Sequence, residues 1–538
     1  MTIQETIMMD NSSRRDFLRA TTMLGGGLLM GSLLPGCGEQ SPKSGGASSA
    51  TALSSSADEK PRRGGRLRLG IIGGDQAGNL DAHKPFNTGS IIRGFALYSK
   101  LWEWNDDMLP KLTLAEFAEP NADASQWTIR LKKGLEFHHG KTVTADDVVF
   151  SILRLTDPGL ASPFSYLVNA VDREGIAKID EFTVRIAFKK GIGFSPLPSL
   201  WVNFGGIVPT DYHPVTNPVG AGPFKYKDFR PGERSLFVRH ENYFLNGQPY
   251  PDELEILDFK DQTSRFAALV SGQIHLANAV SPDQIALFRD NPRARLLVSP
   301  TYAWNGFYLN TAKKPFDDIR VRQAFRLLVD RGELVKRVFN GEGRIANDLY
   351  AAHDPTFNHD IPQRLHDPDG ARRLLREAGV GKLSLELVTN AAGSNAAVVF
   401  AEQARRFDID LHIRQVDEAT YNGSEKADWA ISTGGSLGLP YLAAAVSIDG
   451  PLAVANRSNF YDARFHDLIH QALKEPDVER QKTIVHEAQR IQHERGSLLI
   501  WGFANALDGV SPLVGIQAER SHFPTWRFDR LWLREDTA

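Results

Sequence analysis

The sequence predicts a mixed α/β protein, because two hydrophobic patterns alternate along it. Apolar residues recur at every second position in short segments such as 67–71 and 182–188, which is typical of half-buried strands. In other segments apolar residues lie three and four positions apart behind a capping residue, as in residues 145–155 behind Thr144. With 42% hydrophobic and 24% charged residues, the chain has the composition of a globular protein.

The first recognisable pattern along the chain is that of an export signal. Arg14 and Arg15 precede a Phe-Leu pair and an apolar run over residues 20–34, which contains four glycines. A membrane-spanning helix needs about 20 apolar residues, so this shorter run fits a removable signal. The paired arginines resemble the twin-arginine signal, which a receptor of the export machinery reads. We therefore expect residues 1–36 to be a twin-arginine signal peptide.

Cys37 follows this leader and is the single cysteine of the chain. Since it has no partner for an intramolecular disulfide, its position at the end of the leader predicts a lipidated first residue of the mature protein. Residues 37–63 are rich in Ser, Gly and Ala, which is the composition of a flexible tether. We expect a lipoprotein held at a membrane surface, in the periplasm or at the cell surface.

With a formal net charge of -3, nothing in the composition indicates a nucleic-acid binder, which would usually have a strongly basic domain. Ordered structure is expected from Gly65 onward. Strands are expected at 67–71, 127–131, 182–188 and 383–387. Helices are expected at 144–155, 263–269, 330–340, 367–379 and 478–495, with Thr263 as the cap of the second and an Asp330–Glu333 capping box at the start of the third.

Several blocks of this chain resemble a known family. Residues 127–140 read WTIRLKKGLEFHHG and residues 144–151 read TADDVVFS. They are similar to the "LRKGVKFHDG" and "TAEDVVFS" segments of the peptide/nickel-type (family 5) solute-binding proteins of ABC importers. The segments GAGPF at 220–224, PFDDIRVRQA at 315–324 and DPDGARRLLREAG at 367–379 follow in the order that the family has.

The resemblance implies a two-lobed periplasmic-binding-protein fold of the type II, large peptide-binding kind, with a hinge between the lobes. Lobe I is expected to comprise residues 65–305 and 505–538, and lobe II residues 306–504. It also implies a monomer without cofactor, metal or catalysis, which encloses its ligand by hinge closure and delivers it to an ABC permease in the membrane.

In peptide-binding members of the family, an aspartate after a strand of lobe II pairs with the α-amino group of the ligand. The corresponding stretch here, residues 428–440, has no acid after the strand, although Asp449 follows further on. The resemblance makes Thr433, Gly434 and Ser436 candidate ligand-binding residues.

Aromatic residues near the expected crossovers between the lobes are further candidates, since they offer apolar contact and an indole donor. The remaining candidate ligand-binding residues are Trp304 and Asn305 at the first crossover, Trp501 and Phe503 near the second, and Asn87 and Arg93 in the first ligand-side loop. For both tryptophans, packing in a core is the competing interpretation.

Enzymatic interpretations are weaker. Residues 434–438 read GGSLG and match the G-x-S-x-G nucleophile elbow, which leaves a secreted serine hydrolase using Ser436 as the rival of a different class. Residues 134–142 have one residue too many for a phosphate-binding loop. His138 and His139 are adjacent, so on a strand their side chains point to opposite faces and do not share a metal.

The sequence thus predicts the substrate-binding component of a bacterial ABC importer, with a peptide or peptide-like solute as ligand. An oligosaccharide, an opine or a nickel chelate remains an alternative ligand, and a receptor that signals rather than imports remains an alternative role.

Overall fold

The computed structural model describes residues 59–534, except for residue 75, residues 163–169, residue 205, residues 454–455 and residues 517–526. These described residues belong to one compact unit. The predicted signal peptide with Arg14 and Arg15, and the predicted lipidation site Cys37, lie outside the described residues.

Eleven strands of the described chain build one mixed sheet. Its order is β15-β14-β16-β12-β17-β11-β1-β10-β9-β8, with β13 paired to β17 beside this path. Along this order the strands are β15 (Ile409–Gln415), β14 (Leu383–Thr389), β16 (Ile431–Ser436), β12 (Arg295–Leu309), β17 (Leu498–Val510), β11 (Leu276–Ala277), β1 (Arg66–Ile71), β10 (Glu253–Asp258), β9 (Arg234–Arg239) and β8 (Phe224–Arg230), and beside them β13 (Gly343–Ile345). The β14 strand runs parallel to β15 and β16, and β1 runs parallel to β10 and β11.

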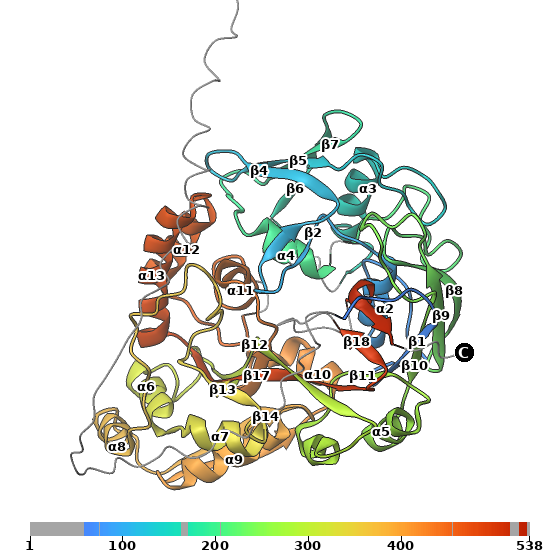
Figure 1. Cartoon of the computed structure of the whole chain (residues 1–538). Coiled ribbons are helices and arrows are strands. Elements are labelled where there is room, and N and C mark those ends of the chain that lie inside the picture. The colour runs from blue at the N-terminus through green and yellow to red at the C-terminus, as the bar shows by residue number, and fades with distance from the viewer. Residues whose placement is uncertain are drawn as a thin grey trace, which may run out of the picture. The chain divides into compact units, whose positions relative to one another are not determined.

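The long strands β12 and β17 connect the two halves of this sheet (Figure 1). They pair antiparallel from Arg295 opposite Val510 to Tyr308 opposite Leu498. The register shifts between Pro300 and Ala303, and again between Asn305 and Gly306. The boundaries predicted between the lobes, after residues 305 and 504, fall within these two paired strands.

A second, antiparallel sheet has the order β4-β5-β7-β6, and two hairpin-like pairs complete the described strands. These strands are β4 (Ala115–Pro120), β5 (Gln126–Leu131), β7 (Thr183–Phe188), β6 (Val171–Lys178), the pair β2 (Trp102–Trp104) and β3 (Pro110–Leu112), and the pair β18 (Val514–Ile516) and β19 (Leu531–Leu533). Helix α3 (Ala145–Leu155) lies beside β6 and β7 (Figure 1), and its capping box joins Thr144 and Asp147.

Helices fill the connections between strands. They are α2 (Thr88–Leu97), α4 (Leu197–Phe204), α5 (Gln262–Ser271), α6 (Ile319–Leu328), α7 (Arg331–Val338), α8 (Pro368–Glu377), α9 (Ser394–Arg405), α10 (Glu418–Asn422), α11 (Tyr441–Ile448), α12 (Ala463–Leu473) and α13 (Val478–Arg495), with the short 3-10 helices η2 (Pro282–Phe288), η3 (Ser424–Ala427) and η4 (Phe528–Arg530).

One predicted helix cap is wrong, and one predicted capping box is not formed. The N-cap of α5 is Asp261, whose carboxylate accepts from the backbone N–H of Ser264 at 2.8 Å, so Thr263 lies inside the helix. A carboxylate at this position also interacts favourably with the helix dipole, which explains why Asp261 takes the cap. Asp330 caps α7 as expected, but its backbone N–H donates to Oε1 of Gln403 at 3.0 Å, so the capping box with Glu333 is not formed.

The hydrophobic interior consists of several clusters, and the largest extends across the predicted boundary between the lobes. It joins Trp127 and Phe194 from the segment of the small sheet with Leu442 of α11 and Phe465 of α12. The contact includes a backbone hydrogen bond of 3.0 Å from the N–H of Ser195 to the carbonyl of Leu473. The small sheet is therefore attached directly to the helical layer of α11 to α13.

Ordered structure begins earlier than predicted. Glu59, expected to belong to the tether, accepts two hydrogen bonds from the guanidinium of Arg534, at 2.7 and 2.9 Å. The backbone N–H of Gly64 donates to the carbonyl of Tyr250 at 3.0 Å. These contacts attach residues 59–64 to the folded body and shorten the predicted tether at its C-terminal end.

Candidate ligand-binding cavity

A cavity of about 290 Å³ lies where strands β14 and β16 end. These two strands run parallel, so their carboxyl ends meet at one edge of the sheet, which is where ligands bind in open α/β sheets. Its lining residues are Asn305, Tyr308, Asn390, Ala392, Gly393, Glu418, Tyr421, Asn422, Thr433, Gly434, Gly435 and Arg457. Ala392, Glu418, Asn422 and Gly435 are exposed, so the cavity is open to solvent.

Two glycines give the cavity its shape. A Cβ atom on Gly434 would lie 2.2 Å from the ring of Tyr308, and one on Gly393 would lie 2.5 Å from Oγ1 of Thr433. Both distances are too short for any side chain. The β16 strand can therefore lie directly over Tyr308, and the start of α9 can lie directly against β16, only because these positions are glycines.

The floor of the cavity is a set of hydrogen bonds around Thr433. The hydroxyl of Tyr421 donates to the carbonyl of Thr433 at 2.5 Å, and Oγ1 of Thr433 donates to Oγ1 of Thr389 at 2.9 Å. Tyr308 is largely buried, and burial raises the pKa of its phenol, so the ring stays neutral. These contacts hold the walls in place without using the groups at the rim.

The rim of the cavity carries one acidic side chain, Glu418, and one basic side chain, Arg457, which are connected through an asparagine. Glu418 accepts a hydrogen bond of 2.8 Å from Nδ2 of Asn390 through Oε1. Nδ2 of Asn422 lies 3.4 Å from Oε2 of Glu418, and Oδ1 of Asn422 accepts from Nη2 of Arg457 at 2.8 Å. Neither Glu418 nor Arg457 has an oppositely charged partner within 4.0 Å among the described residues. Both charges are available to a solute.

The guanidinium of Arg457 lies against aromatic rings. Its carbon Cζ is 4.4 Å from the ring centroid of Tyr421 and 5.7 Å from that of Tyr308. Stacking of this kind fixes the plane of a guanidinium while leaving the in-plane N–H donors free. One of these donors, Nη1, is buried and has no hydrogen-bond partner in the described part of the chain.

Three of the ligand-binding residues expected from the sequence, Asn305, Thr433 and Gly434, line this one cavity. Ser436 lies at the end of β16, paired with Trp304 of β12. The Trp304 side chain is buried in the largest core and meets the Tyr308 ring edge-on, with centroids 6.0 Å apart. It supports the wall of the cavity from behind.

The other two aromatic candidates lie away from the cavity. Trp501 is fully buried in a second core, with its ring 4.6 Å from that of Phe339. Phe503 is 5% exposed and packs edge-on against Tyr302. Core packing, the competing interpretation for the tryptophans, describes the surroundings of both Trp304 and Trp501.

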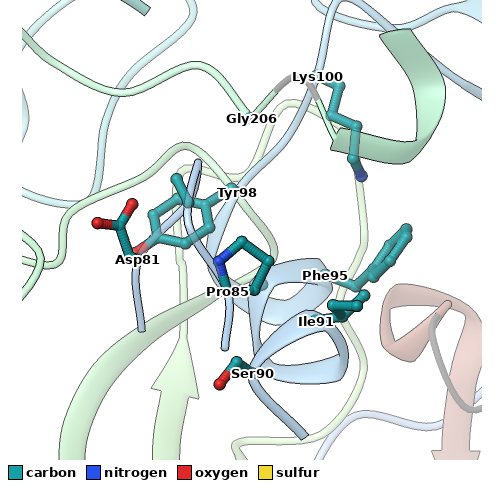
Figure 2. A pocket seen from close by; sticks show the side chains of 10 residues that line it. Asp81, Pro85, Ser90, Ile91, Phe95, Tyr98, Lys100 and Gly206 are labelled. Atoms are coloured by element: carbon teal, nitrogen blue, oxygen red, sulfur yellow. The ribbon is translucent and has the colours of Figure 1, made fainter. Parts of the chain in front are cut away.

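Asn87 and Arg93 make structural contacts at helix α2. Oδ1 of Asn87 accepts from the backbone N–H of Ser90 at 2.9 Å and caps the helix. Arg93 forms a buried ion pair of 2.7 Å with Asp258. A small cavity beside α2, lined by Ile91 and Phe95 among others, has a volume of about 30 Å³ (Figure 2). That space holds about one or two water molecules and is too small for a solute.

Asp449 does not supply the missing acid of the cavity. Its carboxylate accepts from the hydroxyl of Tyr350 at 2.8 Å and from Nε2 of Gln492 at 2.7 Å, and it is fully buried. Burial raises the pKa of Asp449 to about 6. The acid at the cavity is Glu418 instead.

The sequence analysis missed Glu418, Asn390, Tyr421 and Arg457. A partial signal was present for one of them, because Asn390 follows closely on the strand predicted at 383–387, whereas the strand β15 before Glu418 was not predicted. For Arg457 no local pattern exists, since it lies in an irregular segment that only the tertiary fold brings to β16.

The hydrolase interpretation finds no support. Among the residues that the structure describes, no histidine hydrogen-bonds to Ser436, as the base of a catalytic triad would.

Within the same residues there is no group of three or more His, Cys, Asp or Glu side chains that could hold a metal ion. None of the described helices combines the length and the apolar character needed to cross a membrane.

Comparison with known proteins agrees with this architecture. The model of the family described as bacterial extracellular solute-binding proteins, family 5 Middle, matches residues 110–445. Heme-binding protein A of Haemophilus influenzae is 31% identical over 335 residues, which cover 55% of this chain and 60% of that protein. Di/tripeptide-binding protein 2 of Pseudomonas aeruginosa is 28% identical over 424 residues, covering 71% of this chain and 79% of that protein.

Among solved structures, the periplasmic binding protein DppA from Helicobacter pylori in complex with the peptide STSA superposes with a TM-score of 0.74. The match covers 88% of this chain and 99% of DppA at 19% sequence identity. This likeness confirms the predicted two-lobed α/β fold.

Proposed function

Because the chain belongs to the bacterial extracellular solute-binding proteins of family 5, we propose that it is the substrate-binding component of an ABC importer. It binds a peptide or peptide-like solute and delivers it to a membrane permease, and it has no catalytic activity of its own. The observation that carries the choice of ligand is the solvent-open cavity at β14 and β16, with Glu418 and Arg457 at its rim, neither of which has an ion-pair partner among the described residues. A carboxylate and a guanidinium in one cavity suit a solute that carries both charges.

The lobe boundaries belong to this proposal. Lobe I comprises residues 65–305 and 505–538, lobe II comprises residues 306–504, and the hinge lies in β12 and β17. The register shifts between Pro300 and Ala303 and between Asn305 and Gly306 support this position, since ladder irregularities are where paired strands bend most easily. Asn305, the last residue of the first segment of lobe I, and Thr433 and Gly434 on lobe II are then ligand contacts.

Export and anchoring are also proposals. Arg14 and Arg15 direct the chain to the twin-arginine machinery, and Cys37 carries the lipid that holds the protein at a membrane surface. Labelled palmitate should be incorporated into the wild type and not into Cys37→Ala. Replacement of both arginines by lysine should leave the precursor unprocessed in the cytoplasm.

The test of the ligand proposal is thermal unfolding of the purified full-length protein with di- and tripeptides, and in parallel with oligosaccharides, opines and a nickel chelate. A ligand that binds only the native state raises stability by about 2.7 kcal/mol at a hundredfold excess over Kd. We expect a rise in Tm with short peptides. A rise with a sugar or the chelate, and none with any peptide, would contradict the peptide proposal and leave the importer role in place.

A further inference from the structure

We propose that Met108 is a latch between the two lobes. Its side chain holds the hairpin formed by β2 and β3, in lobe I, against two loops of lobe II and so stabilises the closed form of the protein. The proposal rests on the proposed function, because it takes the lobe boundaries and the hinge from there. It adds a residue outside the ligand cavity that shifts the equilibrium between the open and the closed form.

The first argument is the shape of the turn between β2 and β3. Oδ1 of Asn105 accepts hydrogen bonds from the backbone N–H groups of Asp107 and Leu109, both at 2.9 Å. The backbone N–H of Met108 donates to the carbonyl of Asn105 at 3.1 Å. Met108 has a φ of 59°, in the left-handed region that a bulky residue rarely adopts. Such a residue persists where the surrounding contacts impose its conformation, so the contacts of Met108 must offset a local cost.

The second argument is the burial of Met108 at the tip of a hairpin. Met108 is 4% exposed, although Asp106 and Asp107 directly before it are exposed. A methionine side chain is flexible and fills irregular gaps between packed groups. A two-stranded hairpin has too few residues to bury the apolar side chain at its own tip. The groups that cover Met108 therefore belong to another part of the chain.

The third argument is the identity of the covering groups. A Cβ atom on Gly438 would lie 3.0 Å from Cε of Met108 and 2.8 Å from the carbonyl carbon of Tyr302. The loop after β16 can therefore pass this close to both residues only because position 438 has no side chain. The second contact is the ring of His353: burial lowers the pKa of His353 to about 4, and the nearby carbonyl of Met108 opposes that shift. Gly438 and His353 belong to lobe II, so the contact of Met108 crosses the lobe boundary.

The fourth argument is the position of this contact at the hinge. Tyr302 lies within the register shift between Pro300 and Ala303, where the pairing of β12 with β17 is interrupted. Its ring stacks on the ring of His353 with centroids 4.6 Å apart, and Cζ of Arg344 lies 4.8 Å from the centroid of the Tyr302 ring. Both of these partners belong to lobe II. A bend of the strand at the register shift therefore changes the same contacts that cover the latch.

The test measures the separation of the lobes as the distance between two spin labels in the full-length protein. Cys37→Ala removes the single native thiol. Val215→Cys in lobe I and Leu365→Cys in lobe II supply labelling sites that are 78% and 72% exposed. Because protein groups alone make the latch contacts, the short distance of the closed form should be populated without any ligand. Met108→Gly suits a φ of 59° and removes the side chain, so the turn should persist while the ratio of open to closed molecules rises at least about tenfold.

Further variants assign the effect to the latch. Gly438→Ala places a methyl group against Met108 and Tyr302 from the side of lobe II, and it should also favour the open form. Gly381→Ala is the matched control, since a Cβ atom there meets nothing within 4 Å. Met108→Leu keeps an apolar side chain of similar volume and should give the distances of the wild type. An open form alone in the unliganded wild type, or equal distances in the wild type and Met108→Gly, would overturn the proposal.

The outcomes separate this proposal from the proposed function, because the distances are measured without ligand. If no solute binds to the wild type and Met108→Gly still opens the lobes, the latch stands and the proposed function fails. If alanylalanine binds the wild type and Met108→Gly with equal affinity and the distances agree, the function stands and the latch fails. Thermal unfolding of each variant without ligand shows whether it has kept its fold.

Discussion

A Cβ atom on Gly434 would lie 2.2 Å from Cε2 of Tyr308, so these two residues fit together only while position 434 has no side chain. Tyr308 forms one wall of the ligand cavity, and Gly434 belongs to the strand above it. The shape of the cavity and the packing of the β12–β16 pair therefore depend on the same contact.

The first prediction concerns this contact. Gly434→Ala forces the Tyr308 ring out of its position, and overpacking of this kind costs about 1–3 kcal/mol. We expect a lower midpoint of urea unfolding and weaker ligand binding. Gly381→Ala is the control, because a Cβ atom there meets nothing within 4 Å. Unchanged stability and affinity in Gly434→Ala would show that the ring moves freely.

The second prediction concerns Arg93, whose side chain is 1% exposed in its ion pair with Asp258. Removal of one partner leaves a buried charge without compensation, so Arg93→Met should lower the free energy of unfolding by about 3–5 kcal/mol. The double variant Arg93→Met, Asp258→Leu should recover much of that loss. Ligand affinity of the folded fraction should stay at the wild-type value. A loss of ligand affinity in the double variant would indicate that Arg93 takes part in ligand binding.

The third prediction concerns pH. Burial raises the pKa of Asp449 to about 6, whereas an aspartate in the unfolded chain titrates near 3.9. As the pH rises, the unfolded chain loses this proton first, so the stability from the neutral carboxyl is fully present below about pH 4 and is lost through pH 6. Urea unfolding at pH 4 to 7.5 should show Asp449→Asn gaining up to about 3 kcal/mol relative to the wild type. Parallel pH curves would contradict a raised pKa.

The fourth prediction concerns the attachment of the small sheet to the helical layer. A Cβ atom on Gly193 would lie 2.5 Å from the carbonyl oxygen of Asp123 and 2.6 Å from Cα of Lys474. Gly193→Ala should therefore separate this segment from α12, and hydrogen exchange at the N–H of Ser195, which donates to Leu473, reports it directly. We expect exchange at least about tenfold faster, since each 1.4 kcal/mol of local opening is a factor of ten. An unchanged exchange rate at Ser195 would show that the segment around Gly193 accommodates the added methyl group without separating from α12.

Much of the fold was predictable, because local patterns specify it. The predicted strand at 67–71 is β1, the predicted helix at 478–495 is α13, and Asp367-Pro368 opens α8. One error occurred where two candidates lie two residues apart, Asp261 and Thr263 for the cap of α5. The other occurred where a residue distant in sequence, Gln403, accepts from the N–H of Asp330 in place of Glu333.

The site was less predictable, because it is assembled from segments distant in sequence. Asn305, Thr433 and Gly434 were accessible through the resemblance to a family, since they lie in strands near the expected crossover. Arg457 reaches the cavity only through the packing of its irregular segment against Tyr421 and Tyr308. Trp501 illustrates the opposite case, in which a residue type common at ligand sites is buried in a core.

The contact of Glu59 with Arg534 has a practical consequence for how the molecule can be handled. The two ends of the described chain lie together, and neither residue lines the candidate cavity. A surface attached at either end should therefore leave the cavity free, so immobilised protein and protein in solution should give the same affinity. The same geometry makes residues 59 and 534 a fixed reference from which labels on residues 306–504 can report movement of that part alone.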